Sequence, residues 1–99
     1  MSGLKLPNPL RMDGARAAWA QMSPALRAEA AQVLAAAGRE VRLSAAGLTD
    51  FDSSALSLLL SAARQCSEQG ATLKLDDAPE KLRELARVYG VSELFWPVA

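Results

Sequence analysis

Two short stretches in the middle of the chain alternate apolar and polar residues, which is the pattern of a β-strand with one buried face. They span residues 40–46 and 71–75, and their inward side chains are predicted to be Val41, Leu43, Ala45, Leu73 and Leu75. Residues 52–69 lie between them and are long enough for a crossover helix that ends at Gly70. Because a strand, a crossover helix and a second strand form the unit of a parallel sheet, we predict that the two strands pair in parallel.

Ahead of the first strand, the pattern predicts a short extended segment and two helices. Two prolines interrupt the apolar positions of residues 4–12, so we expect one or two short edge strands around a turn. We predict that Asp13 caps the first helix and that Ser23-Pro24 ends it. Ser23 would then cap the second helix, which Gly38 stops. The buried positions are predicted to be Ala17, Ala18, Trp19, Met22, Leu26, Ala30, Val33, Leu34 and Ala37.

The stretch after the second strand predicts two further helices. Asp77, followed by Glu80 three residues later, forms a capping-box pattern with Pro79 in the first turn. Gly90 ends this helix, and Ser92 caps a last short turn. The apolar positions at helical spacing are Leu82, Leu85, Ala86 and Tyr89. Taken in order, these elements predict a small α/β sandwich.

The central helix, residues 52–69, divides into two sides when its residues are placed about 100° apart. One side is rich in leucine and is predicted to face the sheet: Leu56, Leu59, Leu60, Ala63 and Cys66. The other side is a polar stripe: Ser54, Ser57, Ser61, Gln65 and Glu68. Leu58 falls within the polar stripe. It is either an isolated exposed leucine, which is common, or the apolar contact of a surface that docks against a partner.

The Asp-Ser-Ser turn that opens this helix has a structural and a functional interpretation. Asp52 or Ser53 is the natural N-cap, because its side-chain oxygen can accept from the free amides of the first turn. The same helix terminus also stabilises an anion. A phosphate on Ser53 or Ser54 would therefore be tolerated by the fold, and its charge could switch a docking surface off.

Composition argues against nucleic-acid binding and against catalysis. Lys and Arg together number 11, as do Asp and Glu, so the chain lacks the basic surplus of a nucleic-acid-binding protein. It has no histidine and one cysteine, Cys66, which lies on the leucine-rich side of its helix, where a thiol is inert. Asp50 and Asp52 suit capping and solvation, and neither a P-loop nor a GxGxxG pattern is present. We therefore predict no enzymatic activity, no cofactor and no metal site.

Length and hydropathy bound the organisation and the location of the chain. Ninety-nine residues suit a single domain over residues 1–99, because two cores would each be too small. The N-terminus has no apolar signal region, and no apolar run approaches the ~20 residues of a membrane span. We therefore expect a cytoplasmic protein that meets a membrane only indirectly, through a complex.

Residues 40–96 resemble the STAS domain, the fold of anti-sigma-factor antagonists and of the MlaB-type cytoplasmic subunit of bacterial phospholipid ABC transporters. The resemblance rests on the strand VRLSAAGL, the turn Asp52-Ser53-Ser54-Ala55-Leu56 and the ending LARVYGVSELF. It implies an α/β fold with a small mixed β-sheet, helices packed against the sheet, and a binding face around the turn and its helix. Two positions depart from the family pattern: Ser44 stands where many members have Asp, and Ala55 where antagonists have Gly.

The resemblance implies a function through a protein partner. In the transporter subunits the first Ser or Thr of the turn is implicated in contact with the ATPase subunit, which carries onto Ser53. The ending of the chain is closer to this type. We therefore predict a non-catalytic subunit of an Mla-type ABC complex, at the inner face of the inner membrane, that binds and stabilises or regulates the ATPase subunit. Its partner-binding residues are predicted to be Ser53, Ser54, Ser57, Leu58 and Ser61.

The alternative is an anti-sigma-factor antagonist. In that class the second serine of the turn is phosphorylated, which carries onto Ser54, and the partner is an anti-sigma factor kinase. A small hydrolase that uses Ser53 or Ser54 is a third and much weaker interpretation.

Overall fold

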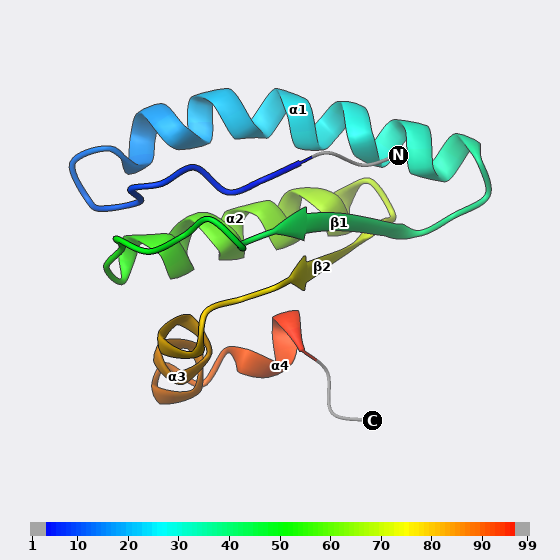
Figure 1. The fold of residues 1–99 in the computed structure, drawn as a ribbon. Coiled ribbons are helices and arrows are strands. Elements are labelled where there is room, and N and C mark those ends of the chain that lie inside the picture. The colour runs from blue at the N-terminus through cyan, green and yellow to red at the C-terminus, as the bar shows by residue number, and fades with distance from the viewer. Residues whose placement is uncertain (1–3, 97–99) are drawn as a thin grey trace.

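Two parallel strands, β1 (Glu40–Ser44) and β2 (Thr72–Asp76), lie at the centre of the computed structural model, which describes residues 4–96 (Figure 1). The helices of this part of the chain are α1 (Ala15–Ala35), α2 (Ser54–Glu68), α3 (Glu80–Val88) and α4 (Ser92–Phe95). Helix α2 connects β1 to β2, and the two strands pair in parallel. The predicted crossover is therefore confirmed.

The alternation of apolar residues sets the register of the two strands. Val41 lies opposite Leu73 and Leu43 lies opposite Leu75, and all four side chains are buried. The α/β class, with helices packed on a small sheet, is confirmed. The resemblance implies a mixed sheet, whereas every pairing between described residues is parallel.

The segment before α1 runs beside β1 and then beside the loop that follows it. It forms two isolated parallel bridges, from Lys5 to Ser44 and from Leu10 to Phe51. The predicted edge strands are thus reduced to single bridges on either side of a turn. Residues 4–10 nevertheless contribute to the core, because Leu10 is completely buried.

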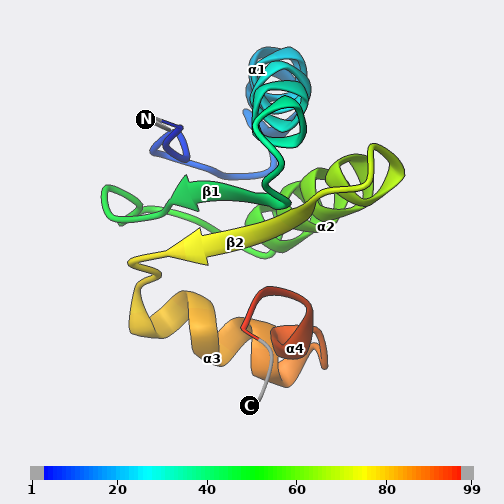
Figure 2. The same cartoon turned by 90° about the vertical axis from the view of Figure 1, so that its right-hand side faces the viewer.

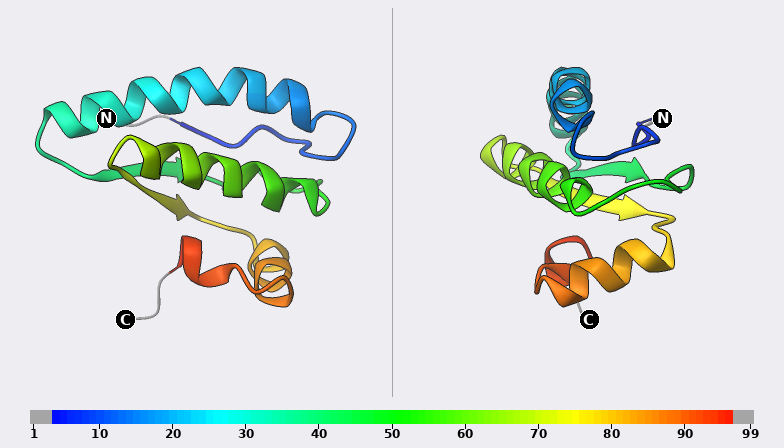
Figure 3. Two further views of the ribbon diagram at one scale, coloured as in Figure 1. Left: turned by 180° about the vertical axis from the view of Figure 1, so that it is seen from behind. Right: turned by 90° about the vertical axis from the view of Figure 1, so that its left-hand side faces the viewer.

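The helices enclose the strands from three directions. In Figure 2 the strands lie between α1 above and α3 and α4 below, with α2 alongside. Figure 3 shows the same arrangement from behind, where α2 lies in front of β1. Helix α1 packs on both β1 and α2, so α2 has two covered faces instead of one. The largest fully buried side chains come from all of these layers: Phe95, Leu10, Leu26, Leu43, Leu48, Leu59, Leu82, Val41 and Cys66.

Helix α1 is one continuous helix of 21 residues, so the break predicted at Ser23-Pro24 is wrong. Proline removes one backbone donor from the helix interior, which destabilises it locally. Contacts to α2 offset that loss: the Ser23 hydroxyl donates to Gln65 Oε1 at 2.6 Å, and Gln65 Nε2 donates to the Ser23 carbonyl at 2.8 Å. Ser23 is therefore a tertiary contact and not a cap.

Both ends of α1 differ from the sequence prediction. Gly14, not Asp13, occupies the N-cap position, and no side chain caps the first turn. The helix ends at Ala35, before Gly38, and Ala37 adopts the left-handed conformation with φ of 65°. Ala17 and Ala37 are exposed, although the pattern placed them on buried faces.

The caps predicted for the last two helices are also wrong. Pro79 occupies the N-cap position of α3 with no side-chain cap, and Asp77 turns the chain with φ of 56°. Val91, not Ser92, precedes α4 as its N-cap. Gly90 does end the α3 region, at a φ of 73° that suits glycine.

Candidate functional site

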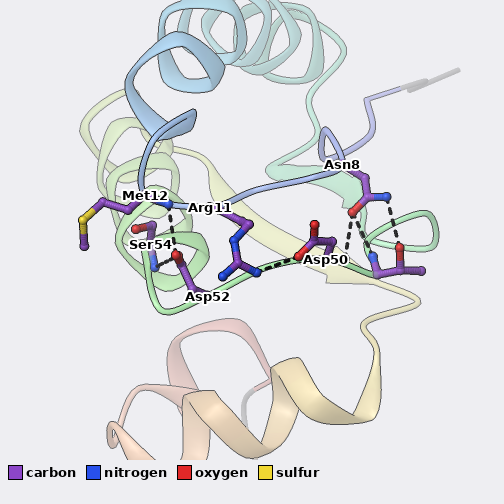
Figure 4. Close-up of polar contacts among 7 residues, drawn as sticks. Asn8, Arg11, Met12, Asp50, Asp52 and Ser54 are labelled. Carbon is purple, nitrogen blue, oxygen red and sulfur yellow. Dashed lines mark hydrogen bonds and ion pairs between the residues drawn. The ribbon is translucent and has the colours of Figure 1, made fainter.

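The Asp-Ser-Ser turn is held by the carboxylate of Asp52 (Figure 4). Asp52 Oδ2 accepts from the Met12 amide at 3.1 Å, and Asp52 Oδ1 accepts from the Ser54 amide at 2.8 Å. These two bonds, the Met12 bond foremost, hold the pKa of Asp52 below its ordinary value because they favour the charged form. Of the two predicted N-cap residues, Ser53 occupies the N-cap position of α2, but its side chain makes no capping bond. Asp52, one residue earlier, instead accepts from the first-turn amide of Ser54.

The segment before α1 lies across the loop that leads into this turn. Asn8 Oδ1 accepts from the amides of Thr49 and Asp50, at 3.0 Å each, and Asn8 Nδ2 donates to Thr49 Oγ1 at 3.1 Å. An ion pair of 2.7 Å joins Arg11 Nη1 to Asp50 Oδ1. No sequence pattern connects these residues, because Asn8 between two prolines predicts only a turn.

The structure separates the five predicted partner-binding residues by exposure. Ser53, Ser57 and Ser61 are exposed and follow one another along α2, and we refer to these three residues as the serine edge. Ser54 is half-buried, beside the Asp52 carboxylate. The serine edge faces outward, as expected for the polar stripe.

Leu58 is not an exposed anchor, so this part of the prediction is corrected. Its side chain is only 4% exposed and belongs to the hydrophobic core. Gln65, from the same polar stripe, is only 7% exposed. The reason is that α1 covers a second face of α2, which a helical projection onto the sheet alone does not include.

Three surface hollows meet at the serine edge. One, of about 140 Å³, lies between Ser53, Ser57 and the end of α3, and a second, of about 450 Å³, lies between Ser53 and α3 itself. The third, of about 310 Å³, lies between α2 and the start of α1 and includes Ser54, Ser57 and Ser61. The first turns of α2 thus project between neighbouring depressions.

Large exposed apolar side chains border these hollows. Met12 is 75% exposed at the third hollow, Val88 81% exposed at the second, and Tyr89 58% exposed at the first. Met and Tyr are enriched where proteins contact one another. The sequence pattern singles out none of the three as a contact residue; it places Tyr89 only among the apolar positions at helical spacing.

The titratable groups near α2 offer little for catalysis. Cys66 is completely buried, and that burial raises the pKa of its thiol, which keeps it protonated. Among residues 4–96, no group of three His, Cys, Asp or Glu side chains is arranged to hold a metal ion.

Within the same residues, no helix is both long and apolar enough to cross a bilayer.

Comparison with known proteins identifies the family to which the sequence is similar. The family model described as "Mlab, STAS domain" matches residues 9–96, which is most of the chain and includes α1, α2 and the serine edge. No curated protein and no solved structure matches significantly.

Proposed function

Because the chain belongs to the MlaB-type STAS domain family, whose members are protein-interaction modules, we propose that it is the cytoplasmic STAS subunit of a bacterial phospholipid-transport ABC complex. In this role it binds the ATPase subunit through the serine edge and stabilises or regulates that subunit without catalysing a reaction. Its contact with the membrane is indirect, through the complex at the inner face of the inner membrane.

The observation that carries this proposal is the surface around the first turns of α2. Exposed small hydroxyl side chains project there between three hollows, and exposed Met12, Val88 and Tyr89 border them. Small side chains let a partner backbone approach, while exposed apolar side chains supply area to be buried. Because Leu58 is buried, the apolar contacts in the proposed interface come from these bordering residues.

A pair of serine variants on the same helix tests the proposal. Ser57→Arg places a long charged side chain at the centre of the serine edge. We expect it to weaken binding of the proposed partner, an ABC ATPase subunit, by more than about tenfold, because a buried unpaired charge is costly. Ser67→Arg makes the same change at an exposed serine about 15 Å further along the helix axis and should leave affinity unchanged.

The measurement is a titration of the purified ATPase subunit with each variant, after melting curves show that both variants fold as the wild type does. Equal affinity of the two variants would show that the serine edge is not the docking surface. No binding of the wild type to any ABC ATPase would reject the transporter role altogether.

The anti-sigma-factor antagonist remains the alternative proposal, with phosphate on Ser54 as its switch. The Ser54 amide donates to Asp52 Oδ1 at 2.8 Å, so a phosphate on Ser54 would lie close to a carboxylate of like charge. That geometry favours the transporter role. Incubation with an anti-sigma factor kinase, followed by mass spectrometry, decides the matter: stoichiometric phosphate on Ser54 would support the alternative.

A further inference from the structure

Residues 8–12 are bonded to the loop before α2 so extensively that they fix its position. Three backbone amides of that loop donate to this segment: those of Thr49 and Asp50 to Asn8 Oδ1, and that of Asp52 to the Leu10 carbonyl. In return, the Leu10 amide donates to the Asp50 carbonyl at 2.8 Å. We refer to residues 8–12 as the clasp.

The clasp is linked to α2 through one side chain. Figure 4 shows Asp52 between Met12 and Ser54, with one carboxylate oxygen bonded to each backbone amide. A displacement of the clasp would therefore move the first turn of α2, where Ser53 lies. Because these contacts join positions about 40 residues apart, they are tertiary restraints and not features of the local turn.

The clasp also brings a side chain to the proposed interface. Met12 is 75% exposed and shares a hollow with Ser54, Ser57 and Ser61. Its backbone is fixed by Asp52 while its side chain extends outward, as Figure 4 shows. Methionine is flexible and adapts to irregular apolar surfaces, so it suits contact with a protein partner.

We propose that the clasp is the second half of the docking surface for the ATPase subunit, an inference that rests on the proposed function. Asn8 and Asp52 are positioning residues that set the orientation of the first turn of α2. Met12 contacts the partner directly. The surface that the partner meets is therefore assembled from two distant parts of the sequence.

The contact role of Met12 is tested by Met12→Ser, with Leu94→Ser as the matched control. Both side chains are exposed, Leu94 to 56%, but Leu94 lies on α4, away from the hollows at the serine edge. We expect Met12→Ser to lower affinity for the ATPase subunit about tenfold, as for the loss of one central contact. Leu94→Ser should not change it. Equal affinities of Met12→Ser and the wild type would overturn this part of the proposal.

The positioning role of Asn8 is tested by Asn8→Ala and rescued by Asn8→Asp. Alanine removes all three side-chain bonds, so the Thr49 and Asp50 amides should exchange with solvent faster, while the amides of β1 and β2 stay protected. A carboxylate at position 8 still accepts from both amides. Affinity for the ATPase subunit should thus fall about tenfold in Asn8→Ala and return in Asn8→Asp.

The outcomes separate this inference from the proposed function. If Asn8→Ala exchanges faster but binds at full strength while Ser57→Arg does not bind, the positioning role is wrong and the serine edge remains the docking surface. If Ser57→Arg also binds at full strength, the docking surface itself is wrong. Should Asn8→Ala fail to fold, Met12→Ser with its Leu94→Ser control still decides the contact role, because it leaves the Asn8 acceptor in place. Asp52→Asn then decides the positioning role, because it leaves one acceptor oxygen for the Met12 and Ser54 amides, and affinity equal to that of the wild type would overturn that role.

Discussion

The two halves of the polar stripe on α2 have different environments. In the first half, Ser57 and Ser61 face outward beside hollows. In the second half, Gln65 is buried and exchanges two hydrogen bonds with Ser23 of α1, whereas Glu68 is exposed. Gln69, just after the stripe, donates through Nε2 to the Arg27 carbonyl at 3.2 Å. A polar stripe on a helix therefore does not by itself indicate an exposed surface.

The outward serines and the buried Gln65 differ because α1 packs against α2 at Gln65, through Ser23. Most buried side-chain amides are hydrogen-bonded, and Gln65 is bonded to Ser23 through both its oxygen and its nitrogen. The serines have no such pairing to α1 and are left for solvent or for a partner. Ser57 and Ser61 are thus available for binding, and Gln65 joins two helices.

The largest effect that tests this comparison is expected at Leu58. Replacement by alanine should lower the free energy of unfolding by roughly 3 kcal/mol, because it removes a buried leucine and leaves a cavity. Urea denaturation of Leu58→Ala measures the change. A loss below about 0.5 kcal/mol would mean that Leu58 faces water in solution, and it would restore Leu58 as an anchor for the partner.

The sequence predicted the strands and the crossover because their apolar periodicity is strong and local. It could not predict which faces of α2 are covered, since the placement of α1 is a tertiary property; hence the errors at Leu58 and Gln65. The predicted cap at Ser23 failed for a related reason. A cap is worth only about 1 kcal/mol, and tertiary contacts such as the Ser23–Gln65 pair compete with it.

The candidate site was predicted in part. The Asp-Ser-Ser motif directed attention to the right turn and to serines that are exposed. Asn8 and Met12 could not be found in this way, because no local pattern relates residue 8 to residue 49 or residue 12 to residue 52. Val88 was not singled out either, because exposure near a helix end depends on what packs beside it.

A smaller effect is expected at Gln65. Gln65→Met keeps a side chain of similar length but removes the bonds to Ser23, so the free energy of unfolding should fall by about 1–2 kcal/mol. Ser23→Ala removes the hydroxyl bond alone and should cost less. In a double-mutant cycle, a coupling energy near zero would show that the two residues do not stabilise the α1–α2 contact.

The pH dependence of stability tests the contacts of Asp52 just before α2. Bonds from Met12 and Ser54, with Arg11 nearby, hold the pKa of Asp52 below its ordinary value in the folded state. Ionised Asp52 therefore stabilises the fold above its unfolded pKa of about 4, and this contribution is lost as the pH falls through the lower folded pKa. The difference in stability between the wild type and Asp52→Asn should accordingly be constant near neutral pH and shrink in acid. A difference that grows below pH 4 would contradict the assigned contacts.

The smallest effect is expected at Ser57. The Ser57 side chain is exposed and forms no hydrogen bond to the residues that the structure describes, so Ser57→Ala should change the free energy of unfolding by no more than about 0.5 kcal/mol. The change should be a slight gain, because alanine is the better helix former. Urea denaturation beside Gln65→Met makes the comparison direct. A loss above about 1 kcal/mol would mean that Ser57 supports the fold, and the distinction between the outward Ser57 and the packed Gln65 would no longer hold.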